Sequence, residues 1–136
     1  MIDLASLVAL GASATRSIEV THELTVQHAY AGLPAVYATP QMILLMEMAA
    51  ADAIAALLPA GWVSVGTRVD VRHLAATPVG ERVTATARVV EVGARHVRFA
   101  CEAHDEHETI GDGWHERAPV DLARFVQGIE RRRAAR

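Results

Sequence analysis

The sequence predicts an α+β domain in which one antiparallel sheet curls around a single long helix. Residues 40–58 consist almost entirely of strong helix formers, and Gly61 lies just beyond their end as a stop signal. This helix is apolar almost all round, so other elements must cover it. The segments around it alternate apolar and polar residues, which is the period of half-buried strands.

Composition indicates one domain that spans residues 1–136. The chain is 51% hydrophobic, which is enough for a core without metal or disulfide support. A net charge of −3 does not favour nucleic acid binding, and the lack of lysine excludes Schiff-base chemistry. The single cysteine, Cys101, is typical of a protein of the reducing cytoplasm. No membrane segment is expected, because Glu47 and Asp52 interrupt the longest apolar stretch.

Strands are predicted on both sides of the helix. The first covers residues 17–26 and is followed by a connection of small residues. Four more are predicted at residues 63–73, 83–92, 97–103 and 109–120. A short helix is expected to begin near Asp121 and to end in arginines that form a solvated tail. One strand, a long apolar helix and four further strands are the element order of the hot-dog fold.

Thr39 stands directly before Pro40, at the expected start of the long helix. A threonine N-cap followed by proline is a common start signal and needs no catalytic role. The N-terminus of a helix also presents unpaired N–H donors and a positive dipole end, so this hydroxyl could stand beside an oxyanion. The two roles are compatible with each other.

Glu47 and His73 are candidates for acid–base chemistry. Apolar helix residues flank Glu47 on both sides, which indicates partial desolvation; the alternative is an ion pair on the wet side of the helix. His73 shares strand parity with the valines at positions 63, 65, 69 and 71, so its imidazole is expected to point toward the helix. A satisfied core histidine would be ordinary, but a carboxylate in the same core favours a Glu47 and His73 pair.

Other polar residues support weaker interpretations. Gly66 interrupts the valine-rich strand, which indicates either a bulge or the close approach of a ligand whose oxyanion its N–H could bind. Arg117 is either a surface ion-pair residue or a ligand for a carboxylate or phosphate. No metal site is predicted, because the histidines lack ligand spacing and His104 and His107 lie in an acidic turn.

A family resemblance lies in three segments, VYATPQMILLMEMAA, VGTRVDVRHLAATPVG and GDGWHERAPVDLARF. In content, order and spacing they resemble the fluoroacetyl-CoA thioesterase-like family of hot-dog proteins. The resemblance implies hydrolysis of a short-chain acyl-CoA to free acid and CoA by a homodimer whose active sites lie near the subunit interface. It also implies a catalytic set of Thr39, Glu47 and His73, with Gly66 and Arg117 in the same oxyanion- and substrate-binding pocket. No metal or redox cofactor is required, and CoA enters as part of the substrate.

The chain departs from the fluoroacetyl-specific members at positions that bear on substrate choice. Tyr30 and Leu33 stand where those members have a phenylalanine-bearing lid, and Trp114 replaces a small hydroxyl residue. All three are expected to line the pocket, although Trp114 could instead simply pack against its neighbours. A general short-chain acyl-CoA thioesterase is expected rather than a fluoroacetyl-specific one. Two alternatives stay open, a non-catalytic module that binds acyl-CoA or acyl carrier and a hot-dog enoyl-CoA hydratase.

Overall fold

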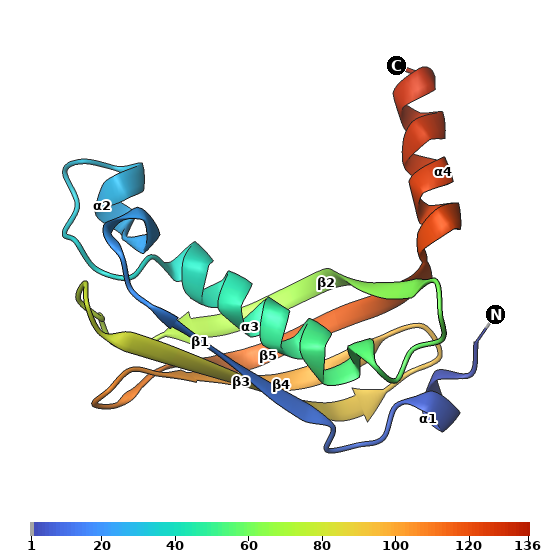
Figure 1. Ribbon diagram of the computed structural model, residues 1–136, viewed down its shortest axis with the longest axis horizontal. Coiled ribbons are helices and arrows are strands. Elements are labelled where there is room, and N and C mark those ends of the chain that lie inside the picture. Colours follow the sequence, from blue (N-terminus) through green and yellow to red (C-terminus); the bar gives the residue numbers. More distant parts are fainter. Residues whose placement is uncertain (1) are drawn as a thin grey trace.

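The computed structural model describes residues 2–136 and shows one curved antiparallel sheet with a long helix across its face (Figure 1). The strands are β1 (Ser13–Glu19), β2 (Trp62–His73), β3 (Arg82–Val92), β4 (Val97–His104) and β5 (Thr109–Asp121), in the sheet order β1-β3-β4-β5-β2. The helices are α1 (Leu4–Leu7), η1 (His22–Leu24), α2 (Val26–Ala29), α3 (Thr39–Ala55) and α4 (Leu122–Ala134). The predicted α+β hot-dog architecture is confirmed.

The core forms between α3 and the inner face of the sheet. Every second residue of β4 is buried, from Val97 through Phe99 and Cys101 to Ala103, as the alternation predicts. The buried residues of α3 are Met42, Leu45, Met46, Ala49, Ala50 and Ile54. One side of the helix is thus held firmly against the sheet.

The other side of α3 is not wrapped, although the sequence predicts that it should be. Leu44 is 49% exposed in the middle of the helix. A single sheet covers only one face of a helix, so part of the apolar surface of α3 faces water in the single chain.

The first strand lies earlier in the chain than predicted. β1 covers Ser13–Glu19, whereas the rest of the predicted strand forms η1 and the start of α2. Thr25 explains the difference, because its hydroxyl donates to the His22 carbonyl (2.7 Å) and accepts from the His28 N–H (3.4 Å). These local bonds stabilise helical turns in a segment whose residue types are also typical of a strand.

A β-bulge in β2 reverses the predicted parity of that strand. The register with β5 shifts between Gly66 and Arg68, so Thr67 has no partner of its own. Paired residues of an antiparallel sheet point to the same side, and Gly66 pairs with the inward-facing Arg117. Before the bulge the even-numbered residues therefore face α3, and after it the odd-numbered ones do.

This change of parity decides which predicted residues face the helix. Val63 and Val65, expected to face α3, point to the outer side of the sheet, because they alternate with Gly66. His73 lies after the bulge and faces inward, as predicted. The bulge thus lets one strand present both Gly66 and His73 to the helix side.

β1 and β2 are the two edge strands of the sheet. β2 is 12 residues long, and among residues 2–136 no strand covers its outer edge. A long open edge is a template for pairing with another strand. No helix in the described part of the chain is long and apolar enough to cross a membrane.

Candidate active site

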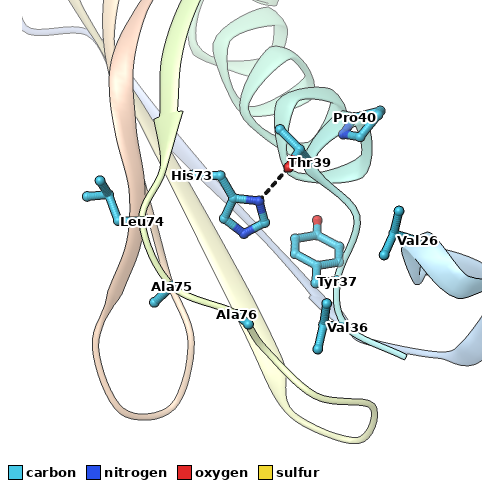
Figure 2. A pocket seen from close by; sticks show the side chains of 9 residues that line it. All are labelled: Val26, Val36, Tyr37, Thr39, Pro40, His73, Leu74, Ala75 and Ala76. Carbon is cyan, nitrogen blue, oxygen red and sulfur yellow. Dashed lines mark hydrogen bonds between the residues drawn. The ribbon is translucent and has the colours of Figure 1, made fainter. Parts of the chain in front are cut away.

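Thr39 and His73 meet at a cavity of about 530 Å³ at one end of α3 (Figure 2). Thr39 Oγ1 lies 2.7 Å from His73 Nδ1, a hydrogen bond that joins the first residue of α3 to the last residue of β2. The other lining residues are Val26, Val36, Tyr37, Pro40, Leu74, Ala75 and Ala76. The cavity therefore presents one polar pair among mainly apolar side chains.

Thr39 is not the N-cap that the sequence predicts. It is the first residue of α3, and Ala38 occupies the cap position. Among residues 2–136 no side-chain hydrogen bond caps this helix end. The Thr39 hydroxyl bonds to His73 instead. Its place beside the unpaired N–H groups of the first turn is compatible with the alternative interpretation, a hydroxyl near a bound oxyanion.

His73 has one ring nitrogen available to a ligand. Burial lowers the pKa of His73, and the nearby Ala75 backbone offsets only part of this effect, so the ring is neutral at pH 7. Its Nε2 is buried, and no group within residues 2–136 forms a hydrogen bond with it. A buried polar atom without a partner is costly, so Nε2 is an atom that a bound molecule would engage.

Glu47 lies in a second cluster, with Gly66 and Arg117. Arg117 Nη1 is 3.6 Å from Glu47 Oε2, and the two side chains are 5% and 29% exposed. A Cβ on Gly66 would lie only 2.5 Å from Glu47 Oε2, so the glycine leaves the space that the carboxylate occupies. The structure thus brings three predicted site residues together around one carboxylate.

Two residues that the sequence analysis did not single out, Ser64 and His115, hold Arg117 in place. Arg117 donates from Nε to Ser64 Oγ and from Nη2 to the Ser64 carbonyl, both at 2.8 Å. Its Nη1 donates to His115 Nε2 at 3.1 Å, and His115 Nδ1 donates to the Arg68 carbonyl at 2.8 Å. Burial is the main reason why the pKa of His115 is lowered, so this ring is neutral and accepts from the guanidinium. His115 and Arg117 are two residues apart in one strand, so both face the helix side. This spacing is the sequence signal that could have identified His115.

Arg117 contacts Glu47 and is shielded from solvent. It is 4% exposed, and burial lowers the pKa of its guanidinium, an effect that the Glu47 carboxylate partly offsets. A phosphate in solvent does not reach a side chain buried this deeply. Of the roles predicted for Arg117, the structure favours the ligand of a carboxylate, and that carboxylate belongs to the protein itself.

Glu47 and His73 do not form the predicted pair within one chain. Glu47 comes eight residues after Thr39 in α3, which is about 12 Å along the helix at 1.5 Å per residue. Within residues 2–136 no hydrogen bond or ion pair joins Glu47 to His73; their recorded polar partners are Arg117 and Thr39, respectively. The single chain therefore holds two half-sites, one at each of these positions along α3.

The comparison with known proteins connects these half-sites to an enzyme family. The profile of the family described as fluoroacetyl-CoA-specific thioesterase matches residues 20–123. The chain belongs to this family. A curated member, the fluoroacetyl-CoA thioesterase of Streptantibioticus cattleyicolor, is 38% identical over 132 residues, which cover 93% of this chain and 95% of that protein. The resemblance seen in the three sequence segments is confirmed.

Solved structures agree with the family assignment. A structure of the fluoroacetyl-CoA thioesterase is 38% identical, has a TM-score of 0.86 and covers 91% of this chain and 96% of its own. A thioesterase superfamily member from Thermus thermophilus is 32% identical, with a TM-score of 0.85 and 93% of each chain covered. A hot-dog-like protein from Thermanaerovibrio acidaminovorans is 27% identical, with a TM-score of 0.88 and coverages of 96% and 97%.

In this member of the thioesterase family, the two residues at the lid positions do not line the cavity. Tyr30 is 68% exposed and Leu33 is 40% exposed, both in the turn after α2. The cavity wall on this side consists of Val26 and Val36 instead. The turn carries Tyr30 and Leu33 outward from this cavity of the single chain, and their place in the pocket of the assembled enzyme stays a prediction.

Trp114 was also predicted to line the pocket and lies on the outer face of the sheet. It pairs with Ala100, and the Arg98 guanidinium lies 4.8 Å from the centroid of its ring. Its neighbour His115 points inward and is buried, so strand alternation sends Trp114 away from α3.

The only cysteine is not a nucleophile. Cys101 is buried against the inner face of the sheet, and burial, helped by the charge of Glu47, raises the pKa of its thiol to about 12. The thiol therefore stays protonated at neutral pH, whereas nucleophilic cysteines react as thiolates.

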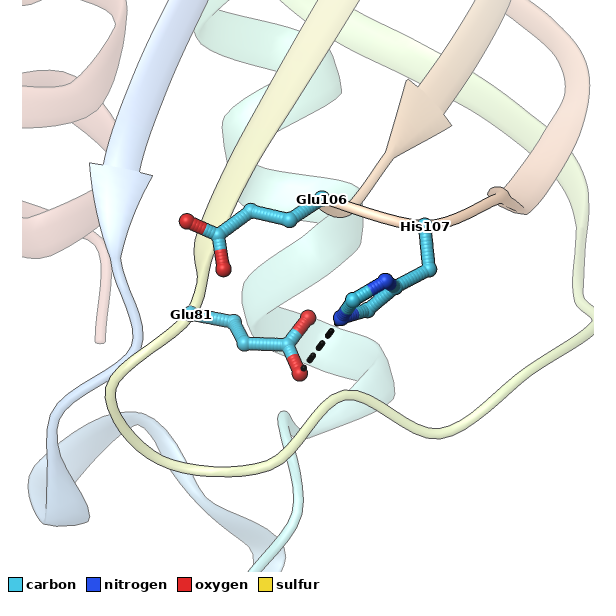
Figure 3. A group of neighbouring side chains, drawn as sticks. All are labelled: Glu81, Glu106 and His107. Carbon is cyan, nitrogen blue, oxygen red and sulfur yellow. Dashed lines mark ion pairs between the residues drawn. The ribbon is translucent and has the colours of Figure 1, made fainter.

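Three potential metal ligands gather on the surface, at Glu81, Glu106 and His107 (Figure 3). Their ligand atoms lie within 4.8 Å of one another, and His107 Nε2 is 3.4 Å from Glu81 Oε2. His104 of the same turn pairs with Glu102 instead. An ion pair joins two of the three residues, His107 and Glu81, and none of the three belongs to either half-site.

Proposed function

We propose that this protein is an acyl-CoA thioesterase that hydrolyses a short-chain acyl-CoA to the free acid and CoA. One observation carries the proposal: the Glu47 carboxylate pairs with the buried Arg117 and lies over Gly66 of β2. The chain that carries this arrangement belongs to the thioesterase family. The family match confirms the predicted enzyme class. Two variants of the fluoroacetyl-CoA thioesterase, 40% and 37% identical to this chain over the aligned residues, were solved with fluoroacetate and CoA and with acetyl-CoA, respectively.

Glu47 acts either by taking a proton from the attacking water or by attacking the thioester carbonyl itself. Direct attack leaves an anhydride between Glu47 and the acyl group, which one water then hydrolyses to the free acid and the Glu47 carboxylate. Attack on the thioester carbonyl gives a tetrahedral oxyanion, to which the Gly66 N–H donates. When this intermediate collapses, the C–S bond breaks and CoA leaves as its thiolate. Over the whole reaction, one water supplies the hydroxyl of the acid and the proton of the CoA thiol. Arg117 contributes by holding the Glu47 carboxylate in its position next to Gly66.

His73 and Thr39 act on the leaving group, which is the CoA thiolate. In the neutral ring, Nδ1 accepts from the Thr39 hydroxyl and Nε2 carries the proton. The Nε2–H, which has no partner within residues 2–136, donates to the sulfur as negative charge develops on it. A neutral donor fits the lowered pKa of His73 better than a resident imidazolium does.

The two half-sites work together across a homodimer. The open edge of β2 and the exposed Leu44 of α3 both favour a second copy as the partner. Antiparallel pairing of two β2 strands runs the His73 end of one copy toward the Gly66 of the other, whereas seven positions separate the two residues within one strand. This supports a site with Glu47 from one subunit and Thr39 and His73 from the other.

Mixing two inactive variants tests the shared site. Glu47→Gln and His73→Ala should each be nearly inactive as homodimers. After subunit exchange, about half of the dimers contain one of each variant, and each of these has one intact site. Thiol release should therefore recover to about a quarter of the wild-type rate. A mass near 14.6 kDa in sedimentation at micromolar concentration, or no recovery after proven exchange, would contradict the shared site.

Substrate choice is tested by thiol release over a panel of acyl-CoAs. We expect kcat/KM values of the same order for acetyl-CoA and fluoroacetyl-CoA, because Tyr30 and Leu33 point away from the cavity. A preference above about a thousandfold, roughly 4 kcal/mol of differential transition-state binding, would contradict this expectation. CoA binding without any hydrolysis would favour the non-catalytic module, and loss of enoyl absorbance would favour a hydratase.

The proposed enzyme is one domain over residues 1–136, and CoA enters only as part of the substrate. Its steps use side chains and water, and no cofactor is assigned a part in them. A cytoplasmic location is in keeping with the free thiol of Cys101, since reducing compartments keep such thiols unpaired.

A further inference from the structure

The C-terminal segment carries charge of the opposite sign to the rest of the chain. Residues 122–136 hold five of the 13 arginines and one of the 16 acidic residues, so they carry +4 while residues 1–121 carry −7. Of the other eight arginines, three pair with carboxylates, Arg117 is buried and Arg98 lies over Trp114. The remaining three, at positions 82, 88 and 95, are exposed but lie six or more positions apart in the sequence. CoA carries a diphosphate and a 3′-phosphate, which the negative body repels and this segment attracts.

A shallow, open hollow of about 550 Å³ lies between α4 and the end of the sheet. The hollow is lined by Trp62, Pro119, Val120 and Asp121 of the sheet and by Arg124, Phe125, Gln127 and Arg131 of α4. Arg124 and Arg131 lie two turns apart on one side of the helix, and both are exposed. An indole on which a purine can stack thus lies in the same hollow as two guanidinium groups that suit phosphates.

The hollow lies on the same face of β2 as the Glu47 half-site. Trp62 and Gly66 are separated by an even number of residues, with no bulge between them, so their positions face the same side of the sheet. Gly66 comes four residues after Trp62, roughly 13 Å along the strand. An extended pantetheine and diphosphate arm spans more than this distance.

We infer that this hollow binds the 3′-phosphoadenosine diphosphate end of CoA. The purine stacks on Trp62, and Arg124 and Arg131 pair with the phosphates. The carboxylate in the hollow, Asp121, caps α4 by accepting from the Arg124 N–H at 3.2 Å, which holds it at the helix end. The inference rests on the proposed function, because it takes acyl-CoA as the substrate.

A double variant, Arg124→Ala with Arg131→Ala, tests the assignment by kinetics. The KM for acetyl-CoA should rise at least about tenfold with little change in kcat, because the affected contacts are remote from the reacting bond. The kcat/KM for acetyl-pantetheine, which lacks the nucleotide, should not change. Arg88→Ala with Arg95→Ala removes the same charge from exposed positions elsewhere and should change the KM less than about twofold.

Calorimetry with CoA, dephospho-CoA and pantetheine separates failure of this assignment from failure of the proposed function, because binding needs no turnover. The Arg124 and Arg131 double variant and Trp62→Ala should each weaken CoA binding at least about tenfold, while pantetheine binding stays unchanged. A weaker effect of the double variant on dephospho-CoA would assign the 3′-phosphate to these arginines. Equal CoA affinity in wild type and double variant, or no CoA binding at all, would overturn the assignment. The expected binding pattern in a protein that hydrolyses no thioester would support the hollow and refute the enzyme.

Discussion

Glu47→Gln lowers kcat at least about a hundredfold in a protein that still folds, if Glu47 acts as proposed. Glutamine keeps the volume and the hydrogen-bonding capacity of the side chain, but it neither attacks a thioester nor takes a proton from water. Arg117 keeps its bonds to Ser64, to His115 and to the Glu47 backbone carbonyl but loses its charged partner, so the free energy of unfolding should fall by about 3 kcal/mol. Thiol release at saturating acetyl-CoA and urea denaturation measure the two effects.

Asp52→Asn is the matched control on the same helix. Asp52 is a carboxylate of α3 whose side chain is 41% exposed and pairs with Arg16 at 2.6 Å, away from both half-sites. Its loss should leave kcat within about twofold of wild type, because a surface ion pair contributes little. Turnover near the wild-type rate in Glu47→Gln would make Glu47 an ordinary ion-pair residue and would refute the mechanism.

Arg117→Met should destabilise the protein and impair catalysis together. Methionine keeps much of the volume but leaves Glu47, His115 and Ser64 without their shared donor. Breaking a buried ion pair from one side costs about 3 kcal/mol or more, so the urea midpoint should fall with the slope unchanged. The kcat should also fall, because Glu47 loses the group that orients it.

Two further variants show whether the loss comes from this buried network. Arg72→Met makes the same change in an exposed pair, where the arginine side chain is 71% exposed, and should cost less than about 1 kcal/mol. Glu47→Gln combined with Arg117→Met should be more stable than Arg117→Met alone, because the unpaired carboxylate is gone. Additive losses in the double variant would contradict a direct coupling between Glu47 and Arg117.

Local patterns in the sequence were sufficient for most of the fold. The alternation from Val97 to Ala103 predicts the buried face of β4 correctly, because strand geometry repeats every two residues wherever pairing is regular. The run of helix formers predicts α3 to within three residues at either end, since its composition and the flanking proline and glycine act within a few residues. The family resemblance, which depends on residue identity at fixed spacing, is confirmed in the same way.

The predictions failed where a long-range contact competes with a local pattern. Thr39 has the local chemistry of a cap, yet its hydroxyl bonds to a histidine 34 residues away. The parity of β2 reverses at Thr67, because its pairing with β5 takes up one extra residue there. Nothing near these residues in the chain reveals either partner.

In the candidate site, too, local patterns predicted individual residues and long-range packing decided their contacts. Helix context and strand parity alone indicated a desolvated glutamate and an inward histidine, whereas the site roles of the strand glycine and the arginine came from the family resemblance. The contacts among these residues depend on the strand register, on the bulge and on the path of α3 across the sheet. Together these features bring Arg117 into contact with Glu47, and Thr39 into contact with His73. Periodicity reports the direction of a side chain from its own backbone, whereas a contact between distant segments depends on how whole elements pack.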